Sequence, residues 1–490
     1  MPPLKSPKSV KKTKLLLIYP SQLYAPAWGG MVAVKPHLMS LFSFLYKAGV
    51  DIRMLDLENE LGRPENKSQV RRFKEKASGL IAGFDFDIAA ISCYTSLNYL
   101  SSVMAARLCK KTNPDCRVVV GGYHPSALPK DFMYAKSPFD FIVKGEGERA
   151  LADICKGKTP KDKHPHLIQG APLNLQNNLR LRWKEYGYLD PNRNYYLYLS
   201  RGCPFNCAFC SESCKGHPGW RALAPAKAAD EIRRLIDFNH PRRISVSDAC
   251  FGFNPRWRRS FLKRLDKTNI NSILGLECRV DTLEKKDIDL LSRFKAIVTM
   301  GLESGSPRMI KILQKSANPK LYLKKCRDAL CYMNKRKLSY IIYLVFNHPG
   351  ETRSTYAETI AFLESIVQGQ ESMSGYIIAQ NYAFFPGSHT FRHINDHKRR
   401  YGTTVAHPAW WKEPENHSQL AREITASNDL DARTKPGNFW DKDILNLNLR
   451  IFKKMPPGIR AIWREVYQRK PVPGVLIPDT IKTIAYIENE

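Results

Sequence analysis

Short apolar runs alternate with segments of helical periodicity along the first 150 residues of the chain. Apolar runs of about four to eight residues are typical of buried strands, and a period near 3.6 is typical of amphipathic helices. The expected strands are 14–19, 50–57, 87–93, 117–120 and 139–143, with helices at 36–48 and 97–112. Strands that alternate with helices form parallel βαβ units, so 14–150 is predicted to be a doubly wound, Rossmann-like α/β domain. Ligands of such sheets bind beyond the carboxyl ends of the strands.

The alternation returns after residues 151–194, a stretch rich in Lys, Pro, Asn and His that lacks periodicity and is expected to be a linker. The next expected strands are 196–200, 244–247, 273–278, 296–302, 340–346 and 376–383, with helices at 226–238, 256–266, 283–293, 318–335 and 353–367. Six β-then-α units predict a partial (β/α)6 TIM-type barrel over 195–390, with its active site at the carboxyl ends of the strands. Residues 391–490 are expected to form a small, mainly helical cap over the barrel mouth, in which Trp410, Trp411 and Trp440 cover the cavity or serve as core residues.

The charge of the chain is strongly unbalanced, since 77 Lys and Arg face 46 Asp and Glu, which gives +31. Such a balance favours an anionic partner, such as a phosphorylated substrate, nucleic acid or an anionic membrane surface, or else is a solvated basic surface. Residues 1–13 form a basic segment that is expected to be a disordered tail. No stretch approaches the roughly 20 apolar residues of a membrane span, so at most peripheral membrane contact is expected. Together these features predict a cytoplasmic protein.

The twelve cysteines are too sparse for a secreted disulfide scaffold, and one group of them is tightly spaced. Cys203, Cys207 and Cys210 form a C-x3-C-x2-C run directly after the first barrel strand. Cysteine thiolates hold Fe–S clusters, usually four to a cubane, so three ligands leave one iron open to a substrate or cofactor. The alternative is a structural zinc site, with Cys214 as fourth ligand and His217 nearby.

The segment 198–210 resembles the cluster loop of radical S-adenosylmethionine (SAM) enzymes, including the aromatic Phe209 before the third cysteine. Segments similar to later motifs of this family follow in order, at 247–254, 276–281, 301–306, 348–352 and 385–388. The resemblance implies a 4Fe–4S cluster on the three cysteines, SAM on the open iron, and a 5′-deoxyadenosyl radical that abstracts hydrogen from an unactivated C–H bond. It also implies an external electron donor of the flavodoxin or ferredoxin type.

The same resemblance implies which residues contact SAM. Glu303 and Ser304 would bind its ribose or amino group, and Arg279 its carboxylate. Asp248 and Phe209 would lie beside the cofactor. The alternative for each polar residue is ordinary polarity at the barrel rim.

The first 150 residues resemble the cobalamin-binding domain that precedes a large subgroup of these enzymes, on a Gly-Gly-Tyr-His-Pro turn at 121–125 and a Gly-Glu-Gly-Glu segment at 145–148. The cobalamin contacts that this implies are Ser92, Thr95, Ser96, Gly121, Gly122, Tyr123, His124, Gly145, Glu146 and Gly147. Glycines allow the backbone to approach a flat macrocycle closely. Residues 21–30 lack the histidine of the Asp-x-His-x-x-Gly motif that ligates cobalt in many cobalamin proteins. Cobalamin is therefore expected to bind without a protein histidine, with His124 as a turn residue; a domain that has lost cobalamin is the alternative.

Taken together, the sequence favours a cobalamin-dependent radical SAM enzyme, a C-methyltransferase that transfers methyl from methylcobalamin to an unactivated carbon of a small molecule. The basic charge of the chain favours an anionic substrate. The first alternative is a radical SAM cyclase, oxidoreductase or ring-rearranging enzyme on the same scaffold, with or without cobalamin. Methylthiotransferases are near relatives, but the cysteines for their second cluster are not convincingly placed. A metal-stabilised nucleic-acid-binding protein is the alternative from another class, and no recognised nucleic-acid motif supports it.

Overall fold

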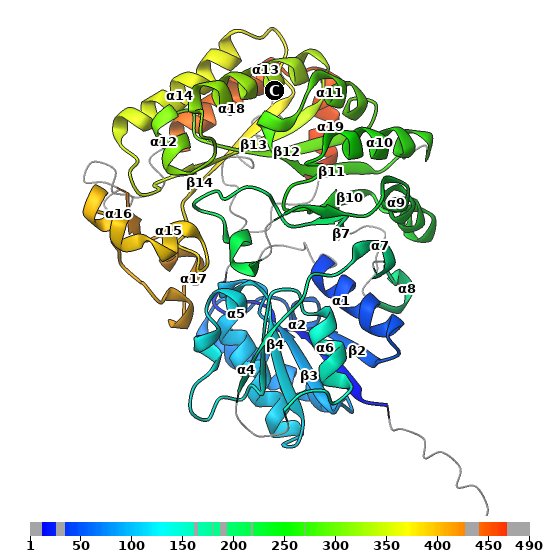
Figure 1. Ribbon diagram of the computed structural model, residues 1–490. Coiled ribbons are helices and arrows are strands. Elements are labelled where there is room, and N and C mark those ends of the chain that lie inside the picture. Colours follow the sequence, from blue (N-terminus) through cyan, green and yellow to red (C-terminus); the bar gives the residue numbers. More distant parts are fainter. Residues whose placement is uncertain are drawn as a thin grey trace, which may run out of the picture.

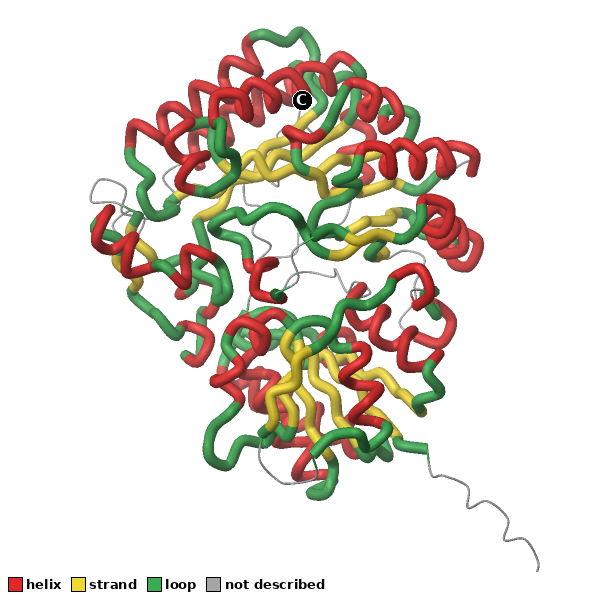
Figure 2. The backbone as a smooth tube through the Cα atoms, viewed as in Figure 1, coloured by secondary structure: helices red, strands yellow, loops and turns green. Residues whose placement is uncertain are grey.

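The computed structural model describes residues 12–25, 35–160, 165–178, 180–186, 194–216, 219–268, 270–426 and 441–467. Two parallel sheets dominate it, one in each of two domains that lie one above the other (Figure 1). The loops that follow the strands of the lower sheet face the upper domain (Figure 2). The predicted fold class, a doubly wound sheet followed by a partial barrel and a mainly helical end, is confirmed.

The first sheet has the order β2-β1-β3-β4-β5-β6, and all its strands are parallel. Its strands are β1 (Lys14–Tyr19), β2 (Asp51–Asp56), β3 (Ile88–Ser92), β4 (Arg117–Gly121), β5 (Phe141–Lys144) and β6 (His166–Gln169). The order changes direction between β1 and β3, which opens a crevice at their carboxyl ends.

Alternate residues of β1 face opposite layers of helices, as the period of two requires. Leu15 and Leu17 pack in the core that α1 (Pro36–Lys47) and α6 (Glu148–Cys155) share. Leu16 and Ile18 pack against α3 (Lys67–Ala82) and α4 (Tyr99–Thr112). Every residue of β1 after Lys14 is buried, which is why the strand appears in the sequence as a continuous apolar run.

Several elements of the first domain were not predicted, and α3 and β6 show why. The helix α3 was not predicted, because only Phe73, Ala77 and Ile81 of its 16 residues are buried. Within the segment that was expected to be a linker, β6 pairs with β5 and forms the edge of the first sheet. An edge strand is half exposed, so its four residues give little hydrophobic signal. Trp183, in the same segment, is buried in the core.

The second sheet has the order β14-β13-β12-β11-β10-β7 and is also parallel throughout. Its strands are β7 (Asn194–Leu197), β10 (Arg243–Val246), β11 (Ile273–Cys278), β12 (Ala296–Glu303), β13 (Ser339–Phe346) and β14 (Gly375–Asn381). The helices that cover it are α9 (Pro225–Asn239), α10 (Pro255–Leu265), α11 (Lys285–Leu291), α12 (Pro307–Ile312), α13 (Pro319–Lys335) and α14 (Arg353–Gln368). All six strands were predicted, and α12 alone of these helices was not.

The described C-terminal residues do not simply cap the barrel mouth. Asn448 of α18 (Asp441–Lys453) accepts from the backbone N–H of Ile377 at 3.0 Å and donates to its carbonyl at 2.9 Å, so this helix covers the edge strand β14. Trp410 and Trp411 are core residues that pack against the first domain. The Trp411 indole donates to Asp131 at 2.7 Å. Trp440 and residues 1–11 lie outside the described part of the chain.

The helices of the described residues include none with both the length and the apolar composition needed to cross a membrane.

The Gly121-Gly122 turn after β4 allows a matched test of packing in the first domain. A Cβ at Gly122, where φ is +125°, would lie 2.2 Å from the carbonyl oxygen of Cys93, whereas a Cβ at Gly121 would lie 3.7 Å from its nearest neighbour, Val143. We expect Gly122→Ala to lower the free energy of unfolding by about 2 kcal/mol or more, because the backbone must shift and the φ is unfavourable. Gly121→Ala should change it by less than about 1 kcal/mol. Guanidinium denaturation of both variants measures the difference, and equal midpoints would contradict this packing.

Candidate functional site

The loop that carries the three cysteines is closed at its base by a short ladder. The strand β8 (Ser200–Arg201) pairs antiparallel with β9 (Arg221–Ala222), and Arg201 lies opposite Arg221. Residues 202–220 therefore begin and end at this ladder, and we call this segment the cluster loop. It contains the 3-10 helix η3 (Ser211–Lys215).

Both arginines of this ladder are held by the Gly-Glu-Gly-Glu turn of the first domain. Arg201 pairs with Glu146 at 3.0 Å and with Glu148 at 2.5 Å, and Arg221 pairs with the other oxygen of Glu146. Burial alone would raise the pKa of Glu146, but Arg201 and Arg221 outweigh it and lower that pKa. We call these four residues the interdomain clamp, because they fix the base of the cluster loop to the turn after β5.

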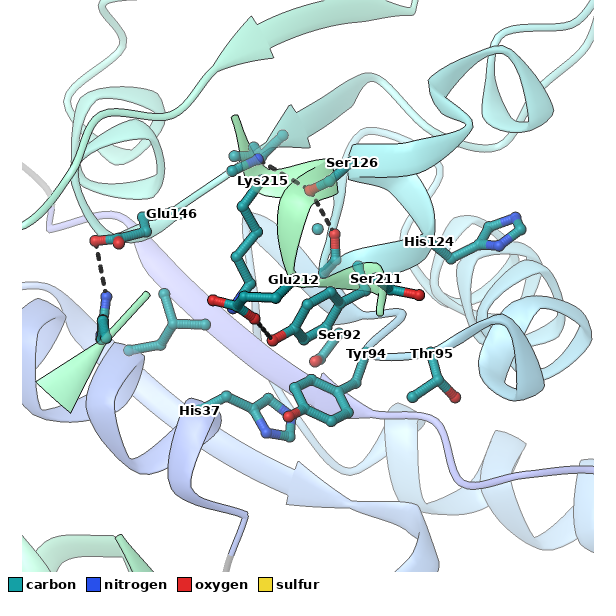
Figure 3. Close-up of a pocket in the computed structure, with 18 of the residues that line it drawn as sticks. His37, Ser92, Tyr94, Thr95, His124, Ser126, Glu146, Ser211, Glu212 and Lys215 are labelled. Carbon is teal, nitrogen blue, oxygen red and sulfur yellow. Dashed lines mark hydrogen bonds and ion pairs between the residues drawn. The ribbon is translucent and has the colours of Figure 1, made fainter. Parts of the chain in front are cut away.

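A second set of contacts fixes the far end of the cluster loop. The Tyr123 hydroxyl, in α5 (Tyr123–Ala127) after the Gly-Gly turn, donates to Glu212 of η3. Lys215 pairs with Glu212 at 3.1 Å and lies 4.1 Å from the centre of the Tyr123 ring. Figure 3 shows Glu212 and Lys215 among the residues that line this part of the cavity. The hydroxyls of Tyr94 and Tyr198 meet at 3.0 Å and add a third link between the domains.

A cavity of about 560 Å³ lies between these contacts and is lined from both domains. Figure 3 shows part of its wall. The residues predicted to contact cobalamin all line it: Ser92, Thr95, Ser96, Gly121, Gly122, Tyr123, His124, Gly145, Glu146 and Gly147. Cys210 lines it from the barrel side. The structure thus brings the predicted cobalamin residues and one predicted cluster ligand to the same space.

Several of these side chains already have partners within the protein. Ser96 Oγ lies 2.8 Å from His124 Nδ1, and His124 Nε2 lies 3.3 Å from Asp131. Burial lowers the pKa of His124, although Asp131 raises it. Gly122 makes its close approach to the Cys93 carbonyl, so internal packing is one reason for glycine there. A Cβ at Gly147 would lie at an ordinary contact distance, 3.7 Å from Leu41, so packing within the protein does not require glycine there.

His37 is a cavity residue that the sequence did not indicate, because it lies outside the Asp-x-His-x-x-Gly spacing. Its ring stacks on Tyr94 with centroids 4.0 Å apart and 11° between the planes. Neither ring nitrogen has a hydrogen-bond partner among the described residues, and burial lowers the pKa of His37 to about 3. The neighbouring residues 26–34, which include part of the segment expected to lack a cobalt ligand, lie outside the description.

The three cysteines lie half-buried in the cluster loop, and charged groups surround the second of them. Arg279 Nη1 lies 3.5 Å from Cys207 Sγ, and the Arg279 guanidinium also binds Asp281 at 3.0 Å. Glu303 pairs with Lys315 at 2.9 Å, and the charges of both residues act on Cys207. Lys315 is a buried lysine that no motif predicted. Of the residues expected to contact SAM, Arg279 and Glu303 therefore lie near Cys207.

Three cysteine thiols in one loop are a donor set that fits an Fe–S cluster. No three His, Cys, Asp or Glu side chains in the described ranges converge as the ligands of one ion would. A cubane offers each thiolate a different iron, so its ligands need not converge on one point. A hydrogen bond from Cys250 lowers the pKa of Cys203 to about 7, while burial raises that of Cys210 to about 12. His217, the alternative zinc residue, lies outside the described residues.

Asp248 and Ser304 have structural tasks that their motif positions did not reveal. Asp248 is fully buried and accepts from the backbone of Leu199 at 2.8 Å and from the Ser200 hydroxyl at 2.6 Å. It thereby fixes the residues that lead into the cluster loop. Ser304 Oγ lies 2.8 Å from Thr359 Oγ1 in a buried site. Phe209 packs beside Val345, Tyr382 and Phe384. None of the five predicted SAM contacts, Arg279 and Glu303 included, lines the cavity.

The interdomain clamp predicts a large difference between two arginine variants. Arg201→Met leaves Glu148 buried without its charged partner, so we expect the free energy of unfolding to fall by about 3–5 kcal/mol. The exposed pair of Arg233 and Asp230, at 3.5 Å, is the control, and Arg233→Met should cost less than about 1 kcal/mol. Guanidinium denaturation followed by circular dichroism compares the two. Equal losses would contradict a clamp that holds the domains together.

Comparison with known proteins gives the first independent evidence on the family. Residues 34–155 match the B12 binding domain, and residues 197–363 match the radical SAM superfamily. An uncharacterized methyltransferase of Pyrococcus horikoshii is 27% identical over 307 residues, which cover 59% of this chain and 66% of that protein. The hopanoid C-3 methylase of Methylococcus capsulatus is 25% identical over 42% of this chain and 41% of its own length.

An anaerobic magnesium-protoporphyrin IX monomethyl ester cyclase of Rubrivivax gelatinosus is 21% identical over 56% of this chain and 53% of the cyclase. These alignments thus span between 41% and 66% of the relatives' lengths. The relatives thus include a methyltransferase, a methylase and a cyclase.

Two solved structures share the fold along nearly the whole chain. The cobalamin-dependent SAM radical enzyme OxsB, with aqua-cobalamin bound, superposes with a TM-score of 0.65 at 15% identity, covering 98% of this chain and 71% of OxsB. The radical SAM methyltransferase TsrM from Kitasatospora setae gives 0.64 at 14% identity, covering 91% and 90%. The order of the two matched domains agrees with the fold that the chain shares with these neighbours. The chain belongs to the radical SAM superfamily and carries a cobalamin-binding domain ahead of its radical SAM domain.

Proposed function

We propose that the chain is a cobalamin-dependent radical SAM C-methyltransferase that acts on a small molecule. The observation that carries the proposal is the shared cavity, whose wall combines the Gly-Gly turn of the first domain with Cys210 of the cluster loop. A methyl carrier and a radical generator can act on one substrate only if both open to the same space. The methylases among the relatives support this activity.

Each cofactor has a proposed set of residues. Cys203, Cys207 and Cys210 hold the 4Fe–4S cluster, and SAM takes the site that three ligands leave open. Arg279 and Glu303, close to Cys207, bind and orient SAM. The first-domain residues that line the cavity hold cobalamin without a protein histidine on cobalt. When bound, these groups supply the radical and the methyl group, and the protein binds, orients and excludes water.

The environment of the enzyme follows from the same chemistry. A cluster of this kind must be reduced before each turnover, so we propose an external donor of the flavodoxin or ferredoxin type. All twelve cysteines are free, which supports a reducing, cytoplasmic compartment. The +31 charge is spread over the whole chain, whereas a substrate meets only the cavity wall. Surface charge is thus a weak guide to substrate charge.

A radical SAM cyclase is the second candidate, and the alignment with the cyclase of Rubrivivax gelatinosus favours it. The products distinguish the two. Methyl transfer consumes one SAM as a methyl donor and one as a radical source, so S-adenosylhomocysteine and 5′-deoxyadenosine both accumulate. Cyclisation yields 5′-deoxyadenosine alone. An anaerobic assay of the cobalamin-loaded enzyme with reductant and SAM, analysed by mass spectrometry, should give both products, and 5′-deoxyadenosine alone would contradict methyl transfer.

The cysteine assignment is tested by two matched variants. We expect Cys207→Ala to lose the cluster iron and reduce 5′-deoxyadenosine formation to background, while cobalamin remains bound, because its proposed site lies on the first domain. Cys214→Ala is the control, since this buried cysteine of η3 contacts the Tyr123 carbonyl at 3.6 Å and is not a proposed ligand. Iron and cobalt content with product analysis measures both variants. Full SAM cleavage in Cys207→Ala would refute the radical SAM site.

A further inference from the structure

The charged side chains that line the cavity form ion pairs with one another, with one exception. Glu146 and Glu148 pair with Arg201, and Glu212 pairs with Lys215. Arg221, the other cation of the wall, pairs with Glu146. Glu277, which also lines the cavity, is the exception, because its carboxylate accepts no hydrogen bond and forms no ion pair within the described residues. The wall therefore contains one carboxyl group that has no hydrogen-bond or ion-pair partner among the described residues.

The position of Glu277 on β11 directs its side chain to the cavity. All residues of this strand except Glu277 are buried. Side chains alternate between the two faces of a strand, and that of Glu277 points to the inner side of the barrel. Its carbonyl accepts from the Phe251 N–H at 2.8 Å, which fixes the backbone there. Ser247 and Ala249, which follow β10, line the cavity beside it. The exposure of this carboxylate is thus to an interior space.

The surroundings of Glu277 disfavour the ionised form of its side chain. Burial, and then the charge of Asp248, raise the pKa of Glu277 to about 7, while Arg243 lowers it. Neither Asp248 nor Arg243 forms a hydrogen bond or ion pair with Glu277 among the described residues. The carboxylate oxygens of Asp248 accept hydrogen bonds from Leu199 and Ser200. Water can solvate the carboxylate while the cavity is open. Once cofactors and substrate displace that water, a buried carboxylate needs a donor or a cation as a partner.

On the proposed function, that partner belongs to the substrate. We propose that Glu277 binds an ammonium group of the substrate, and that the substrate is therefore an amine. This conclusion is opposite to the anionic substrate that the +31 charge favours. The rest of the wall includes Tyr94, Tyr198 and Phe385, whose rings suit an apolar or aromatic body attached to the amine.

Three probes of nearly equal shape test the proposal on the cobalamin-loaded protein: 2-phenylethylammonium, 2-phenylethanol and phenylacetate. Isothermal titration calorimetry gives their dissociation constants. We expect the ammonium probe to bind at least about tenfold more tightly than the alcohol. A hydrogen bond to a charged group contributes more free energy than a tenfold change in dissociation constant requires. Phenylacetate should bind most weakly. In Glu277→Gln the preference for the ammonium probe over the alcohol should vanish.

Two further variants separate recognition from folding. Glu277→Asp keeps the charge and should retain a preference for the ammonium probe. Glu75→Gln, on the exposed side of α3, removes a carboxylate far from the cavity and should behave as the wild type. Thermal unfolding of each variant shows that the protein is folded. These controls assign any loss of preference to the charge at position 277.

The proposal is overturned if the wild type does not bind the ammonium probe, binds it no more tightly than the alcohol, or prefers phenylacetate. It is also overturned if the preference survives in Glu277→Gln. Because binding requires no turnover, any of these results leaves methyl transfer standing. Failure to form both SAM products would instead refute methyl transfer and leave the binding preference intact.

Discussion

The interdomain clamp is the constraint on which the arrangement of the site depends. Two arginines at the base of the cluster loop share the carboxylates of one turn in the first domain, with Glu146 bound to both. Burying such charges costs several kcal/mol per ion, and their attraction offsets this only when the geometry is good. The clamp is therefore better suited to specify one position of the loop than to add stability. Its four residues all line the cavity, so the clamp joins the turn after β5 to the base of the cluster loop at one wall of that space.

This arrangement explains how two domains with separate sheets form one site. The carboxyl ends of both sheets meet at the cavity, so each domain contributes the edge at which parallel sheets bind ligands. Tyr123 and Glu212 then couple the Gly-Gly turn to η3, directly after the third cysteine. A movement of the Gly-Gly turn would therefore also move η3, and the reverse. The free carboxylate of Glu277 faces the space that these contacts enclose.

Much of this structure could be predicted from the sequence, because its signals are local. The strands are continuous apolar runs, and the spacing of Cys203, Cys207 and Cys210 identifies their chemistry. The helix α3 and the edge strand β6 were missed because they bury few residues. A motif shows which residues follow a strand but not which way each side chain points, so Asp248 and Ser304 could not be distinguished from Arg279 and Glu303. Lys315, His37 and the two arginine partners of Glu146 lie near the site only through tertiary structure.

The central claim is that an Fe–S cluster and cobalamin face each other across one cavity held by the clamp. Anomalous diffraction from crystals of the loaded protein, recorded at the iron and cobalt absorption edges, tests it most directly. The account predicts iron density in contact with Cys203, Cys207 and Cys210, and cobalt density in the same cavity beside the Gly121-Gly122 turn. Cobalt bound elsewhere, or iron away from these cysteines in the fully loaded protein, would contradict it.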